Sequence, residues 1–343
     1  MPATPPQQPQ PRTVSLDIAV NGAFLTRRWE QPENWMRLTR ECGYGVHSFC
    51  FDVLDPFFSG PDDFLREEAE KTRAAADKYG VTICDLYTGV ATHRFHGFSH
   101  SDARARQRMR DWVSGALDLA RIMGVDQIGG HVDAFSCEVL ADEARTEEAM
   151  VRLIETYRDI VREAKQKSLR AFYSEQMYIP SEVPWTLAQT ERLLIECNRD
   201  NADAAAFRVA LDVGHQAGMH YGLDPDSPDC RYEDWLRRFG ATSELIHLQQ
   251  TTRDASHHWP FTPERNAQGD VNIATVLEML AESHKNYAAS PVAAHLPPVD
   301  KHYLVLEAIP GSTKTETKLL DELTQSAAYL RQFVPEGGLT IAV

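Results

Sequence analysis

The feature that most constrains the fold is a regular alternation of short apolar runs and longer segments with helical periodicity. The pattern begins near Val14 and repeats eight times. The predicted strands cover 14–20, 45–51, 81–86, 127–132, 169–174, 207–212, 245–248 and 303–306. The predicted helices cover 31–42, 61–79, 101–123, 142–167, 186–199, 232–239, 272–283 and 314–334. Eight strand–helix units are the count of a (β/α)8, or TIM, barrel.

An open, doubly wound sheet would alternate in the same way, but two observations favour the barrel. The repeat reaches eight, and no Gly-x-Gly-x-x-Gly follows the first strand. We therefore predict one α/β domain, a single TIM barrel over 13–343, with no internal linker. The Pro- and Gln-rich residues 1–12 are predicted to form a disordered tail, and 217–231 and 284–302 are predicted to be surface loops.

Charge and cysteine content narrow the classes of partner. The chain has 35 Lys and Arg against 50 Asp and Glu, a net charge of -15, which disfavours binding to nucleic acid or to an anionic membrane. No apolar run approaches the roughly 18 residues of a membrane span. The six cysteines form no Cys-x-x-Cys pair, so we expect buried free thiols and a cytoplasmic location.

Acidic and imidazole side chains recur where the last four predicted strands end. They are Glu175, Asp212, His247 and Glu307. In a TIM barrel the carboxyl ends of all strands meet at one mouth, where active sites are built. A single carboxylate at a strand end is usually solvated or caps the next helix, but four such groups on consecutive strands are difficult to explain in that way.

A divalent cation is the simplest way to stabilise such a cluster, because three neighbouring carboxylates repel one another. Three carboxylates and one imidazole form an oxygen-rich set of ligands. This set suits Mn²⁺ best, with Mg²⁺ and Co²⁺ as alternatives. We therefore predict one divalent metal ion held by these four residues.

The sequence blocks around these residues resemble those of the xylose-isomerase-like TIM-barrel superfamily, which includes the AP endonuclease family 2. The blocks are Ser174-Glu175-Gln176-Met177, Leu211-Asp212-Val213-Gly214-His215, Ile246-His247-Leu248-Gln249 and Leu306-Glu307-Ala308. Within this superfamily they look most like the ketose 3-epimerase branch, which includes sugar-phosphate epimerases. The resemblance covers most of 14–334 and implies an epimerase or isomerase of a small ketose or ketose phosphate.

The resemblance also implies roles for individual residues. Glu175 and Glu307 would be the proton-transfer pair in addition to holding the metal. The branch has a His three residues after the metal Asp and an Arg six residues after the metal His. His215 and Arg253 occupy these positions, which implies that both contact substrate oxygens.

Two further residues are candidates for substrate contact. His131 ends the fourth predicted strand and should face the mouth, where it would either bind substrate or cap the following segment. The family often carries a second carboxylate six residues after its first Glu, but this chain has Ser181 there. Either Glu182 takes over that contact or the contact is lost.

The residue types suit epimerisation through a cis-enediolate. One carboxylate removes a proton next to a ketone, the other returns it to the opposite face, and the cation stabilises the negative charge. The same enediolate could collapse to an aldose or arise by loss of CO₂ from a 3-oxo acid, so the residues leave three outcomes open.

Narrower resemblances, to erythrulose-phosphate epimerases or isomerases and to a 3-oxo-isoapionate decarboxylase, make decarboxylation the main alternative. An abasic-site endonuclease is less favoured, because it would require more metal ligands and a basic face. We expect a small-molecule sugar or sugar phosphate as the partner. Relatives are often dimers or tetramers, so a homo-oligomer is compatible with the sequence.

Overall fold

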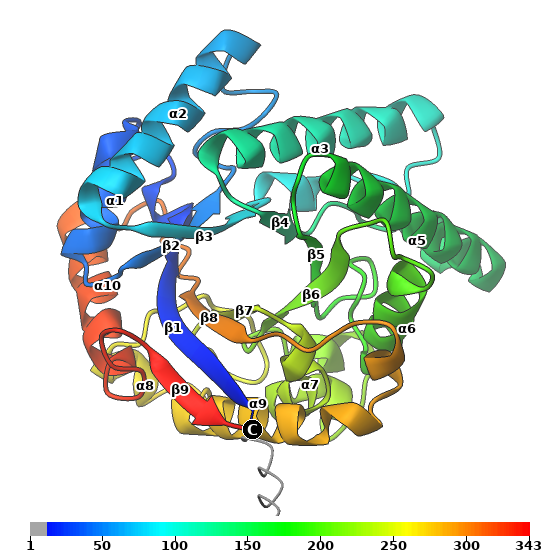
Figure 1. The fold of residues 1–343 in the computed structure, drawn as a ribbon. Helices are drawn as coiled ribbons and strands as arrows, with labels where there is room; N and C mark the ends of the chain where they lie inside the picture. The colour runs from blue at the N-terminus through cyan, green and yellow to red at the C-terminus, as the bar shows by residue number, and fades with distance from the viewer. Residues whose placement is uncertain (1–11) are drawn as a thin grey trace, which may run out of the picture.

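The computed structural model of the protein describes residues 12–343, and its centre is a closed barrel of eight parallel strands (Figure 1). The strands follow one another around the barrel in chain order, and β1 closes it by pairing with both β8 and β2. A ninth strand pairs antiparallel with the start of β1. The strands are β1 (Thr13–Asn21), β2 (Val46–Cys50), β3 (Thr82–Tyr87), β4 (Gln127–Gly130), β5 (Ala171–Glu175), β6 (Ala206–Asp212), β7 (Leu245–Leu248), β8 (Lys301–Leu306) and β9 (Leu339–Ala342).

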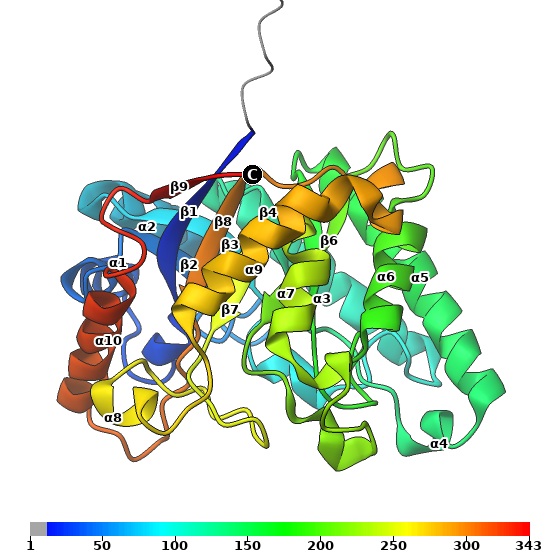
Figure 2. The same ribbon diagram turned by 90° about the horizontal axis from the view of Figure 1, so that it is seen from below.

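Helices surround the barrel and cover the outer face of its sheet, as Figures 1 and 2 show from two directions. They are α1 (Pro32–Glu41), α2 (Asp62–Tyr79), α3 (Ala103–Met123), α4 (Cys137–Leu140), α5 (Glu143–Gln166), α6 (Leu187–Asn198), α7 (Tyr232–Phe239), α8 (Pro263–Asn266), α9 (Ile273–Asn286) and α10 (Glu316–Leu330). Short 3-10 turns lie in the connections, among them η2 (Ala91–Arg94). The predicted TIM barrel is thus confirmed.

The chain path differs from the predictions in several details. Strand β9 follows the last helix and was not predicted. The predicted loop 284–302 is partly regular, because α9 continues to Asn286, two 3-10 turns follow, and β8 begins at Lys301. The predicted tail lies outside the described residues except for Arg12, whose guanidinium donates to the Val299 carbonyl at 2.7 Å.

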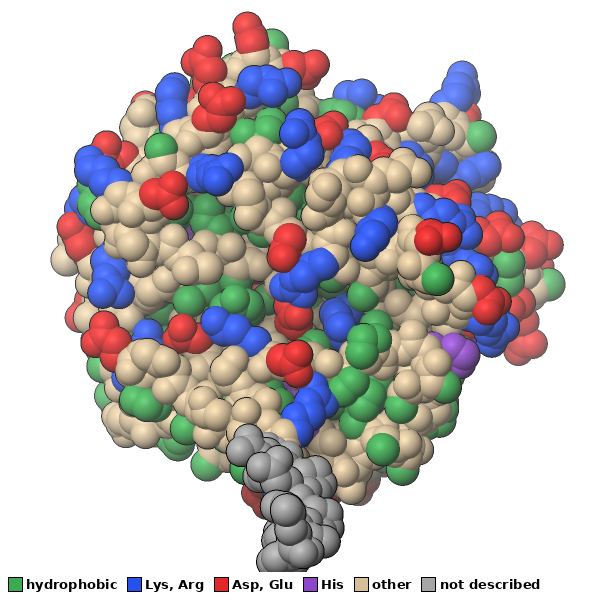
Figure 3. All heavy atoms as spheres, viewed as in Figure 1, with side chains coloured by type: hydrophobic (Ala, Val, Ile, Leu, Met, Phe, Trp, Pro, Cys, Tyr) green, Lys and Arg blue, Asp and Glu red, His purple; other side chains and the backbone are tan. Residues whose placement is uncertain are grey.

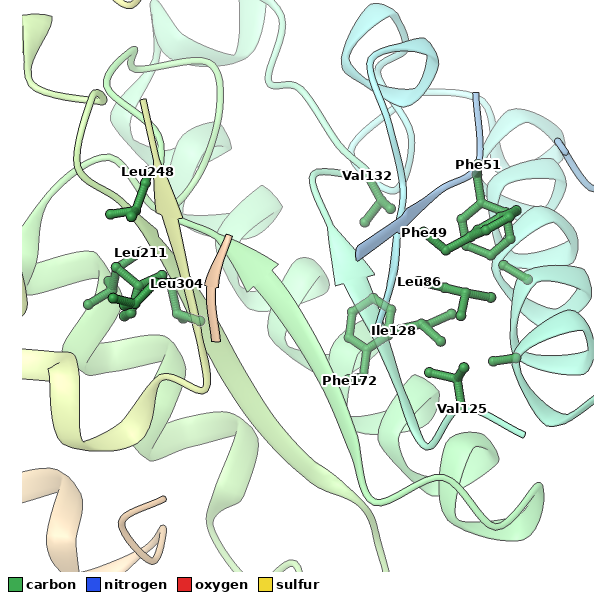
Figure 4. Packing of buried hydrophobic residues seen from close by; sticks show 14 of the residues in the cluster. Phe49, Phe51, Leu86, Val125, Ile128, Val132, Phe172, Leu211, Leu248 and Leu304 are labelled. Carbon is green, nitrogen blue, oxygen red and sulfur yellow. The ribbon is translucent and has the colours of Figure 1, made fainter. Parts of the chain in front are cut away.

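Alternation of side chains along the strands separates two apolar regions. In β6, Phe207, Val209 and Leu211 point outward to the helices, whereas Ala210 belongs to a smaller cluster inside the barrel. Figure 4 shows such outward-facing residues on two sides of the barrel. Because successive residues of a strand face opposite ways, Asp212 lies on the same inner face as Ala210. The packing of the outer core therefore orients the acidic side chain inward.

The amino ends of the strands form a face that carries ion pairs. Figure 3 views this face and shows Lys and Arg interspersed with Asp and Glu. Arg170 lies between Asp126 and Glu244 and pairs with both, at 2.9 and 2.5 Å. The carboxyl ends of the strands lie at the opposite end of the barrel, at the bottom of Figure 2.

Cysteine burial follows the prediction with one correction. All six thiols are free and five are buried, but Cys137 in α4 is exposed. Within residues 12–343, none of the helices combines the length and apolar character needed to cross a bilayer.

Two buried histidines near the amino ends of the strands predict a loss of stability at acid pH. The Nε2 atoms of His302 and His284 lie 2.8 Å apart, and His302 Nδ1 lies 2.7 Å from the Ser243 carbonyl. Burial, reinforced by His284, lowers the pKa of His302 from 6.5 to about 3. The unfolded chain therefore takes up a proton below its ordinary pKa of about 6.5 that the folded chain does not, so stability falls as pH decreases.

We expect the free energy of unfolding of the wild type to fall by about 2 kcal/mol more between pH 7 and pH 5 than that of His302→Gln. Urea unfolding at both pH values measures this difference, and the pH-independent cost of the substitution cancels. An equal fall in both proteins would show that His302 is not the acid-sensitive group.

Candidate metal centre and active site

Strand register brings the four predicted metal ligands to one place at the mouth of the barrel. Glu175 is the last residue of β5 and pairs with Ala210, two residues before Asp212 on the same face of β6. Asp212 pairs directly with His247 of β7. The backbone N–H of Glu307 donates to the Leu248 carbonyl, which extends the β7–β8 pairing by one step. Adjacent parallel strands therefore position all four side chains.

One donor atom from each of Glu175, Asp212, His247 and Glu307 lies within 4.8 Å of the other three, and all four residues are buried. We call this group the four-donor cluster. His247 Nδ1 is 2.8 Å from Glu175 Oε1 and 3.4 Å from Glu307 Oε2. Ligand atoms around an octahedral ion with bonds of about 2.1 Å lie about 3 Å apart, so these separations are close to those of a metal site.

An unpartnered polar atom in the four-donor cluster supports the same assignment. Glu307 Oε2, which faces His247 Nδ1, is buried and has no hydrogen-bond partner among the described side chains. Buried polar atoms are rarely left without a partner, because the loss of hydration is costly. The donor set and this atom fit a divalent cation.

Mutual attraction keeps the two glutamates of the cluster ionised. Burial raises the pKa of Glu175, but the adjacent His247 outweighs burial and lowers this pKa to about 2. Burial and His247 act on Glu307 in the same opposing ways, and its pKa is lowered. Burial lowers the pKa of His247, while Glu307 and Glu175 raise it well above its ordinary value. A metal bound at His247 would replace the imidazole proton.

Amide side chains hold Asp212 in place. Gln249 Nε2 donates to both Asp212 oxygens at 3.1 Å, and the backbone N–H of Gly214 donates to Oδ1 at 2.6 Å. A Cβ at position 214 would lie 2.1 Å from the Gln249 side chain, so only glycine leaves room for this amide. Such outer contacts orient a ligand before the metal binds. Gln249 and Gly214 were not predicted to have these roles.

The structure places His215 beside the four-donor cluster. Its Nε2 lies 3.6 Å from Asp212 Oδ2, and its Nδ1 lies 2.7 Å from the Gln176 carbonyl. Burial lowers the pKa of His215, but Asp212 and Glu175 outweigh burial and raise it. The Tyr178 ring packs against it at 5.0 Å. A donor in this position suits a substrate oxygen near the metal.

Arg253 lies further out, on an exposed turn after β7. Its backbone N–H donates to Asp270 Oδ2 at 2.9 Å. In the described part of the chain, its guanidinium makes no ion pair with the four-donor cluster. The predicted contact of Arg253 with substrate stays a prediction.

The other two predicted substrate contacts lie close to each other. His131 follows β4, is 1% exposed, and has Nε2 at 3.9 Å from Glu182 Oε1. His93, in η2, has Nδ1 at 3.7 Å from the same oxygen. We call His93, His131 and Glu182 the His–Glu trio. His93 was not among the predicted site residues, and only the path of the connection after β3 shows where it lies.

Tyr87, at the end of β3, is a second residue that the sequence analysis did not identify. Its hydroxyl donates to Glu175 Oε2 at 2.8 Å and lies 3.5 Å from His93 Nε2. Tyr87 therefore joins the four-donor cluster to the His–Glu trio. A Tyr at the end of a strand usually packs in the hydrophobic core. Only the hydrogen bond across the barrel to Glu175 distinguishes Tyr87 from such a residue.

We expect Tyr87→Phe to lower the turnover number about 10- to 100-fold, because a hydrogen bond to a charged group contributes about 1.5–3 kcal/mol. Far-UV circular dichroism should be unchanged, since the ring itself is kept. Tyr173→Phe is a matched control, because its hydroxyl donates at 2.5 Å to Asp85 rather than to the cluster. Full activity in Tyr87→Phe would show that this hydrogen bond does not position Glu175.

The barrel, with acidic and imidazole side chains at the ends of its strands, matches a known protein family. The sequence profile of the xylose isomerase-like TIM barrel family matches residues 36–290, and the chain belongs to this family.

Individual relatives are more distant in sequence. D-erythrulose 1-phosphate 3-epimerase of Brucella abortus (strain 2308) is 24% identical over 270 residues, which cover 78% of this chain and 84% of that protein. A crystal structure from Rhodospirillum rubrum, provisionally assigned as a xylose isomerase, has a TM-score of 0.79 and 21% identity. The match covers 93% of this chain and 100% of the Rhodospirillum rubrum chain.

The fold also matches D-psicose 3-epimerase of Clostridium cellulolyticum H10, with a TM-score of 0.64 and 15% identity. That match covers 93% of this chain and 98% of the epimerase. At these identities the structural matches describe the fold alone.

Proposed function

We propose that the protein is a divalent-metal-dependent 3-epimerase of a small ketose or ketose phosphate, with D-erythrulose 1-phosphate as the first candidate substrate. The observation that carries the proposal is the placement of two buried glutamates, Glu175 and Glu307, which both lie beside His247. They come from β5 and β8, the outer two of the four adjacent strands that form the cluster. The similarity to an erythrulose-phosphate epimerase supports this substrate class.

Each glutamate has a defined part in the reaction. One carboxylate removes the proton from C3, and the electron pair of that C–H bond moves toward the C2 carbonyl to give an enediolate. The other glutamate must hold a proton in the substrate complex and returns it to the opposite face of C3, so one carboxyl group gains a proton while the other loses one. The two residues exchange roles in the reverse direction, so the reaction is balanced without any redox partner.

Substrate binding and orientation would depend on the metal in the four-donor cluster and on four further side chains. Glu175, Asp212, His247 and Glu307 would hold a divalent ion, which would stabilise negative charge on the ketone oxygen. Mn²⁺ suits the oxygen-rich set best. His215 would donate to a nearby substrate oxygen, while Arg253, His131 and Glu182 would contact the end of the substrate away from the cluster.

Solvent deuterium exchange tests the proposal. The Mn²⁺-loaded protein, incubated with D-erythrulose 1-phosphate in D₂O, should incorporate deuterium at C3, seen by NMR, and the optical rotation should fall as the L-enantiomer accumulates. An aldose phosphate product would instead indicate an isomerase. Release of CO₂ from a 3-oxo sugar acid, without exchange into ketoses, would favour the decarboxylase. Absence of C3 exchange with a panel of ketoses and ketose phosphates would contradict the proposal.

A further inference from the structure

The His–Glu trio lies beside the four-donor cluster and is not required for proton transfer. Donor atoms of His93, His131 and Glu182 all lie within 4.8 Å of one another. They come from three successive strand-to-helix connections, after β3, β4 and β5. The Tyr87 hydroxyl contacts both His93 of this group and Glu175 of the four-donor cluster.

Hydrogen bonds between the three connections hold the trio in place. Thr92, next to His93, donates its hydroxyl to the His131 carbonyl at 2.5 Å, and Thr88 donates to the same oxygen at 3.2 Å. The Phe135 N–H donates to the Ser181 carbonyl at 2.7 Å, which joins the connection after β4 to the loop that carries Glu182. These hydrogen bonds fix the positions of the three connections, and so of their side chains, relative to one another.

Unpartnered nitrogens in the trio point to a ligand. His131 is 1% exposed, and neither of its ring nitrogens has a hydrogen-bond partner among the described atoms of residues 12–343, which leave out the Arg94 side chain. A buried imidazole in this state is uncommon, because buried polar groups normally find partners. Burial also favours its neutral form, which has a lone pair available for a metal.

The separations within the trio suit a metal ion better than direct or water-mediated hydrogen bonds. Glu182 Oε1 lies 3.7 Å from His93 Nδ1 and 3.9 Å from His131 Nε2, beyond hydrogen-bond range. A water molecule bonded to both atoms of a pair at about 2.8 Å would set them about 4.6 Å apart. Tetrahedral ligands at about 2.0–2.1 Å from a metal lie about 3.3 Å apart, which small side-chain rotations would reach.

We propose that His93, His131 and Glu182 hold a second divalent ion of the zinc class, whose open positions bind an anionic oxygen at the far end of the substrate, such as a phosphate. Two imidazoles and one carboxylate are a donor set of catalytic zinc sites, in which the remaining coordination positions are free for ligands. The Tyr87 hydroxyl can accept from His93 Nε2–H, which leaves Nδ1 for the metal. The role toward substrate rests on the proposed function, whereas the metal site does not.

Metal stoichiometry tests the site independently of turnover. The full-length protein is stripped with a chelator, reloaded with Co²⁺ or Zn²⁺, passed through a desalting column and measured by plasma mass spectrometry. We expect two equivalents in the wild type and one in His93→Gln and in Glu182→Gln. Both side chains are partly exposed, at 20% and 12%, so these substitutions should leave the fold intact. His96→Gln, in the same loop but exposed, should keep two equivalents.

Asp212→Asn should retain one equivalent and the visible absorption of four-coordinate Co²⁺, because the trio is unchanged. A wild-type protein that binds a single equivalent, or two equivalents retained in both His93→Gln and Glu182→Gln, would overturn the second site. Neither result would affect C3 exchange by the Mn²⁺-loaded protein, which tests the proposed function separately.

Discussion

Replacing either Glu175 or Glu307 with glutamine is expected to lower proton exchange at C3 by about a thousandfold, within the 10²- to 10⁴-fold range of general acid–base catalysis. Glutamine keeps the shape of each side chain but can neither accept nor return a proton. Both carboxylates are buried and lie beside His247 in the four-donor cluster. Deuterium incorporation measured by NMR gives the rate for each variant.

Glu244→Gln provides the control for this pair, because Glu244 lies just before β7 at the opposite end of the barrel and pairs with Arg170. It should exchange protons at the wild-type rate. A variant of Glu175 or Glu307 that retained most of the exchange would contradict the mechanism with two carboxylates. Metal content should be measured in every variant, since both glutamates are also proposed ligands.

Removal of the divalent metal is expected to abolish turnover and to lower the melting temperature. A ligand at about 100 times its dissociation constant stabilises the folded state by about 2.7 kcal/mol, which for a domain of this size corresponds to roughly 5 °C. The physical reason is the set of three carboxylates, whose mutual repulsion a cation relieves. Scanning calorimetry of the chelator-treated protein, before and after addition of Mn²⁺, measures the shift.

Asp212→Asn separates this effect from metal binding elsewhere. Mn²⁺ prefers carboxylate-rich ligands, so the variant should show little Mn²⁺-dependent change in melting temperature. Full activity of the metal-free wild type, or a Mn²⁺ shift of equal size in Asp212→Asn, would show that the four-donor cluster is not the metal site.

Sequence periodicity was enough to predict the barrel, because each strand carries apolar residues that must pack against a helix. Strand β9 was not predicted, because it lacks such a run of buried apolar residues. Its residues alternate between partly buried and exposed, and it is stabilised by backbone pairing with Thr13–Leu16 at the other end of the chain. Such long-range pairing leaves little local signal.

The four-donor cluster was likewise accessible to sequence analysis. Parallel strands end at a common mouth, so an acid at the end of one strand is near the group that ends the next. The structure brings Glu175, Asp212, His247 and Glu307 together, as this reasoning predicted. Their identification as metal ligands is a proposal that the experiments above test.

Strand periodicity and chain order are local properties, so the class of fold and the residues at the strand ends could be predicted from the amino-acid sequence. The contact of Tyr87 with Glu175, which is 88 positions away, and the meeting of His93 with His131 and Glu182 depend on tertiary structure. Side chains on loops meet according to the path of each loop and the packing beneath it. That path depends on contacts between distant segments, such as Thr92 with the His131 carbonyl, which no local pattern encodes.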